Sequence, residues 1–147
     1  MKQTALAKWF LFSESDFCIE KNMPERNLRN LIAGMEITES LGNLSSEIKN
    51  IAFDSRKVRS DGLFVAIPGE KHDGSKFIKE ALDKGATAII TEASLESLSS
   101  LHIDREKVTL LKASDSRKSL AIASANFYEN PSTYLSLTGI TGTNGKT

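Results

Sequence analysis

The feature that most constrains the fold is a continuous apolar run, residues 63–67, enclosed by Gly62 on one side and by Pro68 and Gly69 on the other. A strand with one wet face alternates apolar and polar residues, whereas an unbroken apolar run is typical of a strand covered on both faces. Two covered faces require other elements packed above and below the sheet. The run therefore predicts an α/β fold, in which it forms a central strand.

The segments around this run alternate between strand and helix patterns. The expected strands cover residues 48–53, 63–67, 86–91, 108–111 and 135–140. The expected helices begin near Pro24, Ser75 and Ser114 or Asp115, and they end at Gly34, Gly85 and Pro131. Proline suits a first helical turn and stops a helix later on, and glycine commonly closes one. The alternation predicts a small mixed sheet with crossover helices.

Composition excludes several classes of function. The 19 basic and 19 acidic residues give a formal net charge of zero, so no broad field favours nucleic acid. Cys18 is the only cysteine and cannot form an intramolecular disulfide, which fits a reducing cytoplasm. No segment approaches the roughly 20 apolar residues that cross a bilayer. We expect a cytoplasmic monomer that binds neither nucleic acid nor membrane.

A glycine-rich segment, residues 139–147, directly follows the last expected strand. Gly142 and Gly145 let backbone N–H groups approach phosphate oxygens, Lys146 adds a positive charge, and the Thr147 hydroxyl can bind Mg²⁺. The spacing departs from the general phosphate-loop pattern, because Ile140 stands where that pattern has its first glycine. The segment therefore predicts a variant phosphate loop for ATP, and its alternative is a glycine-rich turn.

A second group of polar residues, Asp54, Ser55 and Arg56, follows an expected strand. Ligands of open α/β sheets bind beyond the carboxyl ends of strands, and a hydroxyl and a guanidinium suit a phosphorylated ligand. The alternative is an ion pair of Asp54 with Arg56 within a turn, with Asp73 and Gly74 forming another ordinary turn. Spacing alone leaves both interpretations open.

Taken together, six segments resemble the Mur ligase family over residues 26–147. They are residues 54–56, 63–69, 73–74, 85–88, 127–132 and 141–147. Their ordered succession is more specific than any single motif. The resemblance implies an N-terminal extension at residues 1–25, a domain at residues 26–132 that binds a UDP-linked substrate, and the first strand and phosphate loop of a truncated ATPase domain at residues 133–147.

The resemblance also implies an activity. Within the family, the chain is most similar to the ligase that adds diaminopimelate or lysine to UDP-N-acetylmuramoyl-L-alanyl-D-glutamate in peptidoglycan synthesis, with ATP and Mg²⁺. Its expected ligands are the UDP-N-acetylmuramoyl dipeptide and ATP, and 147 residues are expected to be catalytically inactive on their own. The alternatives are a fragment of the fourth-step ligase of the same pathway and a non-catalytic module that binds UDP-sugars.

Site residues follow from the matched motifs. The substrate contacts implied by the resemblance are Phe53, Ser55, Glu70, Lys71 and His72. The ATP contacts implied are Gly142, Thr143, Asn144, Gly145, Lys146 and Thr147, of which Lys146 is the catalytic residue and Thr147 the magnesium ligand.

Overall fold

The computed structural model describes residues 26–69, 73–101, 103–136 and 138. Its main feature is a five-stranded sheet with the strand order β2-β7-β6-β5-β4. The strands are β2 (Ile37–Leu41), β4 (Asn50–Ala52), β5 (Gly62–Ala66), β6 (Ala86–Thr91) and β7 (Thr109–Ala113). Strands β4 to β7 run parallel, and β2 pairs antiparallel with β7. The predicted mixed α/β sheet is confirmed.

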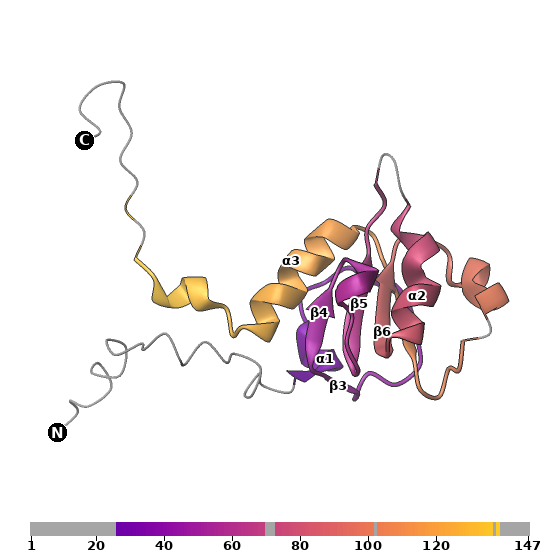
Figure 1. Ribbon diagram of the computed structural model, residues 1–147. Coiled ribbons are helices and arrows are strands. Elements are labelled where there is room, and N and C mark those ends of the chain that lie inside the picture. The colour runs from indigo at the N-terminus through magenta and orange to yellow at the C-terminus, as the bar shows by residue number, and fades with distance from the viewer. Residues whose placement is uncertain (1–25, 70–72, 102, 137, 139–147) are drawn as a thin grey trace.

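Helices cover this sheet on both sides. The α-helices are α1 (Leu28–Leu31), α2 (Ile78–Asp83) and α3 (Ser116–Phe127). The short 3₁₀ helices are η2 (Ser55–Lys57), η3 (Gly74–Phe77), η4 (Leu95–Leu101) and η5 (Pro131–Tyr134). Figure 1 shows α2 and α3 on opposite sides of strands β4, β5 and β6. Strands β1 (Arg26–Asn27) and β3 (Glu47–Ile48) pair in a separate antiparallel ribbon.

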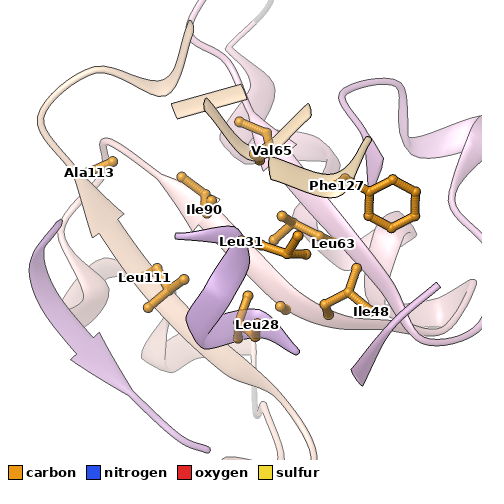
Figure 2. Packing of buried hydrophobic residues seen from close by; sticks show 11 residues of the cluster. Leu28, Leu31, Ile48, Leu63, Val65, Ile90, Leu111, Ala113 and Phe127 are labelled. Carbon is orange, nitrogen blue, oxygen red and sulfur yellow. The ribbon is translucent and has the colours of Figure 1, made fainter. Parts of the chain in front are cut away.

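Alternate residues of each inner strand face two different hydrophobic clusters. Leu63 and Val65 of β5 belong to the cluster under α1 and α3, whereas Phe64 belongs to the cluster under α2 and η4. Figure 2 shows the first cluster, in which Phe127 packs beside Leu63 and Ile48. Side chains of a strand point alternately to the two faces of the sheet. A strand whose residues belong to both clusters therefore has to be apolar throughout.

The prediction for residues 63–67 is therefore confirmed in its main point. All five residues of β5 are buried, and the strand has hydrogen-bonded neighbours on both edges. The middle strand of the sheet, however, is β6, whose observed bounds match the predicted residues 86–91. The apolar run thus identified a covered interior strand but not the centre of the sheet.

Two other expectations need correction. The strand predicted at residues 48–53 is divided, because Ile48 pairs with Arg26 in the ribbon while β4 begins at Asn50 in the main sheet. Strand β2 was not anticipated, since four of its five residues are exposed and its sequence has no apolar alternation. An edge strand with little buried surface leaves a weak signal in the sequence.

Two of the three predicted helices have the expected caps, whereas the helix expected to begin near Pro24 starts only at Leu28, because Arg26 and Asn27 form β1 and the Asn27 side chain caps α1. Asp115 precedes α3, and its side chain accepts a hydrogen bond from the Lys118 backbone N–H at 2.9 Å. Gly85 follows α2 with φ +97°, a left-handed conformation that costs glycine little. These two caps fix where the chain leaves α2 and enters α3.

Candidate functional site

The carboxyl ends of the four parallel strands meet at one edge of the sheet. Strand β4 leads into residues 53–56, β5 into residues 67–69, β6 into Glu92, and β7 into residues 114–116. Ligands of open α/β sheets bind at this edge, because loops and helix N-termini converge there while the strands hold them in place. We call these four segments the carboxyl edge.

Phe53 is an exposed aromatic residue at the end of β4. It follows Ala52 directly, and its side chain is 63% exposed. An aromatic ring that is not packed in the hydrophobic core is available to stack on a planar ligand. The predicted substrate contact at Phe53 is thus accessible.

Asp54 and Arg56 form the turn ion pair that was one of the two sequence interpretations. The Asp54 carboxylate accepts hydrogen bonds from the Arg56 guanidinium at 2.8 and 3.0 Å and from its backbone N–H at 3.0 Å. The side-chain hydrogen bond, followed by the backbone one, lowers the pKa of Asp54 to about 2. The guanidinium therefore already has a carboxylate partner, and its remaining N–H groups lie on an exposed side chain.

Ser55 lies between these two residues, and its side chain points inward. It is 5% exposed, and its Oγ lies 2.6 Å from Oε2 of Glu80 on α2. Since 25 positions separate the two residues, nothing in the sequence spacing indicated this contact. The hydroxyl that was expected to serve a phosphorylated ligand is already engaged with a carboxylate.

Asp73 and Gly74 form the structural turn that was expected before α2. The Asp73 carboxylate accepts a hydrogen bond from the Ser75 backbone N–H at 2.9 Å. A Cβ on Gly74 would stand 2.5 Å from the Ile67 carbonyl oxygen, so only glycine fits there. The close approach of Gly74 to Ile67 and the bridge between Pro68 and Asp73 together hold the two ends of the turn next to each other. Glu70, Lys71 and His72, which were predicted to contact the substrate, lie outside the described residues.

Further along the carboxyl edge, sequence reasoning missed the contacts of Glu92. Its carboxylate accepts a hydrogen bond from the Ser116 backbone N–H at 2.8 Å, which satisfies the first turn of α3. The Ser116 hydroxyl is buried and has no hydrogen-bond partner among the described residues. The Arg117 guanidinium donates to the Pro68 carbonyl at 3.2 Å. These contacts connect the ends of β5, β6 and β7 to one another.

The predicted ATP site is at the carboxyl-terminal end of the chain. Gly142, Thr143, Asn144, Gly145, Lys146 and Thr147 lie outside the described residues. Of the strand predicted at residues 135–140, the described residues Leu135, Ser136 and Thr138 form no strand. Leu135 is 63% exposed. An apolar run becomes a strand only beside a hydrogen-bonding partner, and the described part of the chain places none next to it.

A surface cavity of about 360 Å³ lies at the opposite, amino-terminal edge of the sheet. It is lined by Ser46, Glu47, Lys49, Asp61, Thr87 and Lys107. Lys49 is paired with Asp61 at 2.9 Å, and Lys107 with Asp104 at 3.2 Å. With both lysines paired to carboxylates, the cavity offers no excess of positive charge for a phosphate group, and we do not assign the site to it.

Membrane-spanning helices and clusters of metal ligands are both absent from the described residues. None of the helices formed by these residues has the length and apolar character needed to span a bilayer. The His, Cys, Asp and Glu side chains of the same residues form no group of three or more that could hold a metal ion.

Comparison with known proteins decides the family. The profile of the Mur ligase family, catalytic domain, matches residues 47–128, which include β4 to α3 and the whole carboxyl edge. The chain belongs to the Mur ligase family. The resemblance seen in the sequence motifs is thus confirmed over more than half of the chain.

Relatives in this family carry consistent names. A UDP-N-acetylmuramoyl-L-alanyl-D-glutamate--2,6-diaminopimelate ligase of Clostridium botulinum is 46% identical over 121 residues, 82% of this chain and 24% of that protein. A ligase of the same name from Clostridium tetani is 40% identical over 120 residues. A UDP-N-acetylmuramyl-tripeptide synthetase of Oceanobacillus iheyensis is 38% identical over 121 residues. The chain spans about a quarter of the length of these Mur ligases.

Among solved structures, a crystal structure of MurF from Acinetobacter baumannii superposes with a TM-score of 0.52 at 22% identity. The match covers 75% of this chain and 22% of that one. At this identity the likeness concerns the fold, and it supports the mixed sheet described above as a Mur ligase fold.

Proposed function

We propose that this chain is the uridine-nucleotide-binding part of an ATP-dependent ligase of peptidoglycan synthesis. The ligase would add diaminopimelate or lysine to UDP-N-acetylmuramoyl-L-alanyl-D-glutamate. The observation that carries the proposal is the carboxyl edge, which presents an exposed Phe53 beside a buried Ser55 within the family-matched segment. The names of relatives at 38–46% identity support the third step of the pathway.

In the proposed complex, the uracil ring stacks on Phe53. Base stacking on an aromatic side chain contributes about 1–3 kcal/mol and needs one open face of the ring, which the exposure of Phe53 provides. Ser55 would add a polar contact to the nucleoside. Glu70, Lys71 and His72 stand in the sequence between Gly69 and Asp73, and we assign them to the same ligand.

ATP use is the second part of the proposal and rests on family membership and on the segment of residues 142–147. Lys146 would neutralise charge on the transferring phosphoryl group, and Thr147 would bind Mg²⁺. In this chemistry the substrate carboxylate attacks the γ-phosphorus and ADP leaves. The amine of the incoming amino acid then attacks the acyl carbon, losing a proton as inorganic phosphate departs. Because this chain covers 24% of the Clostridium botulinum relative, we assign the remaining catalytic residues to the part of the ligase that the chain does not cover.

The domain division follows the same reasoning. We propose a substrate domain at residues 26–132, an ATPase domain that begins at residue 133, and an extension at residues 1–25. We also propose that the ligase acts as a cytoplasmic monomer, where ATP and UDP-linked precursors are available. The fourth-step ligase, MurF, is less well supported, since the Acinetobacter baumannii structure is 22% identical and shares the fold alone.

Calorimetric titration with UDP, with the UDP-N-acetylmuramoyl dipeptide and with ATP tests the binding proposal. We expect the 147-residue chain to bind both uridine ligands, and Phe53→Ala to weaken both by about tenfold through lost stacking. Phe77→Ala, which removes another partly exposed phenylalanine from η3, is the matched control and should bind as the unmodified chain does. Equal binding by all three proteins would contradict the proposed site.

A further inference from the structure

The contact between Ser55 and Glu80 joins the candidate site to α2. Their oxygens are 2.6 Å apart, and Glu80 is also paired with Lys84 at 3.2 Å, one turn further along α2. Ser55 is almost completely buried, so its hydroxyl has few orientations available. What this hydroxyl can offer to a ligand depends on which way its single proton points.

The charge state of Glu80 decides the direction of that proton. The hydrogen bond from Ser55, followed by the one from Lys84, lowers the pKa of Glu80 below its ordinary value of 4.5. Glu80 is therefore ionised at neutral pH, and an ionised carboxylate only accepts hydrogen bonds. The Ser55 O–H must donate to Glu80, which leaves the lone pairs on Oγ as the only capacity that Ser55 can offer to a ligand.

We propose that Glu80 is a positioning residue that holds the Ser55 hydroxyl as a hydrogen-bond acceptor, so that the site selects a donor group on its ligand. This inference rests on the proposed uridine-nucleotide function. A uridine nucleotide carries such donors at the N3–H of its uracil ring and at its ribose hydroxyls, whereas the uracil carbonyls and the ionised phosphates only accept. Ser55 therefore contacts the nucleoside and leaves the phosphates to other groups.

The neighbouring residues support this assignment. The Arg56 guanidinium, which would otherwise favour a phosphate at this strand end, is paired with Asp54. Glu80 behind Ser55 is likewise paired with Lys84, so neither ion pair adds a net charge to the site. Selectivity at this point therefore comes from the Ser55 lone pairs, which can accept from a donor such as the N–H of the uracil imide.

Binding of UDP, N3-methyl-UDP, 2′-deoxy-UDP and 3′-deoxy-UDP to the 147-residue chain tests the inference, and equal binding of all four would overturn it. We expect the analogue that lacks the recognised donor to bind about tenfold more weakly than UDP, because the Ser55 acceptor is then buried without a partner. In Glu80→Ala the hydroxyl is free to rotate, so this preference should disappear. Glu80→Gln keeps a carbonyl that can accept from Ser55 and should retain the preference.

A comparison of single and double variants distinguishes two roles of Glu80: orienting the Ser55 hydroxyl, or only stabilising the fold. If Glu80 acts through Ser55, adding Glu80→Ala to Ser55→Ala should weaken UDP binding no further. Lys84→Ala removes the other partner of Glu80 and is the matched control, in which the preference should remain. Thermal unfolding of every variant checks that the fold is intact, and Glu80→Gln and Lys84→Ala carry the test if Glu80→Ala does not fold.

The outcomes are distinct. A preference that survives in Glu80→Ala, a preference that is lost in Glu80→Gln, or additive losses in the double variant would overturn the positioning role while leaving the proposed function in place. Failure of the unmodified chain to bind UDP at all would overturn the proposed function, and this inference with it.

Discussion

At the scale of single residues, the turn after β4 shows how a local ion pair controls acidity. The Arg56 side chain is the largest cause of the lowered pKa of Asp54, which is about 2 in the folded chain against an ordinary 3.8. A carboxylate whose pKa is depressed by folding stabilises the fold above its unfolded pKa. That contribution is lost as the pH falls from about 4 through about 2.

We therefore predict that Asp54→Asn changes the response of stability to acid. The free energy of unfolding of the unmodified chain should fall relative to that of Asp54→Asn between about pH 4 and about pH 2. Only the unmodified chain has a paired carboxylate at this position that becomes protonated in this range. Urea unfolding at several pH values measures the difference. Arg56→Ala should return the carbon-13 titration midpoint of the Asp54 carboxyl toward 3.8, and an unchanged midpoint would refute the assigned cause.

Two glycines with positive φ provide a second residue-scale prediction. Gly34 has φ +85° and open space around it, whereas Gly42 has φ +107° and a Cβ there would stand 2.8 Å from the Val108 carbonyl oxygen. Gly34→Ala should cost roughly 1–2 kcal/mol of unfolding free energy from backbone strain alone. Gly42→Ala should cost more, because its methyl group also displaces the edge between β2 and β7. Equal losses in chemical denaturation would rule out the steric contribution.

At the scale of elements, the sheet is held between two hydrophobic clusters, and β6 contributes to both. Ile89 belongs to the cluster under α2 and η4, and Ile90 belongs to the cluster under α1 and α3. Both side chains are fully buried. We predict that Ile89→Ala and Ile90→Ala each cost about 2–5 kcal/mol in urea unfolding. Leu135→Ala removes a side chain of similar size that is 63% exposed, so this control should be nearly neutral. If one of these two substitutions lowered the free energy of unfolding only slightly, the face of the sheet on which that residue lies would not be covered as described.

The elements also show which parts of the fold the sequence makes visible. Continuous apolar runs and helix caps act locally, so β5, β6 and α3 could be predicted from residues 63–67, residues 86–91 and Asp115. The division between β3 and β4 depends on partners far away in the sequence, which no local pattern records. For the same reason the strand end at Ser55 could be predicted as a candidate site, but its bond to Glu80 could not.

At the scale of the whole molecule, both hydrophobic clusters are built from residues between Leu28 and Phe127. The carboxyl edge lies within the same limits, between Phe53 and Ser116. A folding unit needs its own core, and the described residues supply one on each face of the sheet. The proposed substrate domain at residues 26–132 therefore contains the elements that position its site.

Because both hydrophobic clusters and the carboxyl edge lie between Leu28 and Phe127, we predict that residues 26–138 fold and bind UDP as the 147-residue chain does. We expect one cooperative thermal transition within a few degrees of that of the full sequence, because both clusters keep all their members. A shorter chain that ends at residue 122 is the matched control. It loses Ala123 and Phe127 from the cluster under α1 and α3, so it should unfold without a cooperative transition. If residues 26–138 instead failed to fold, residues outside that range would have to supply part of the core, and the proposed domain boundary would be wrong.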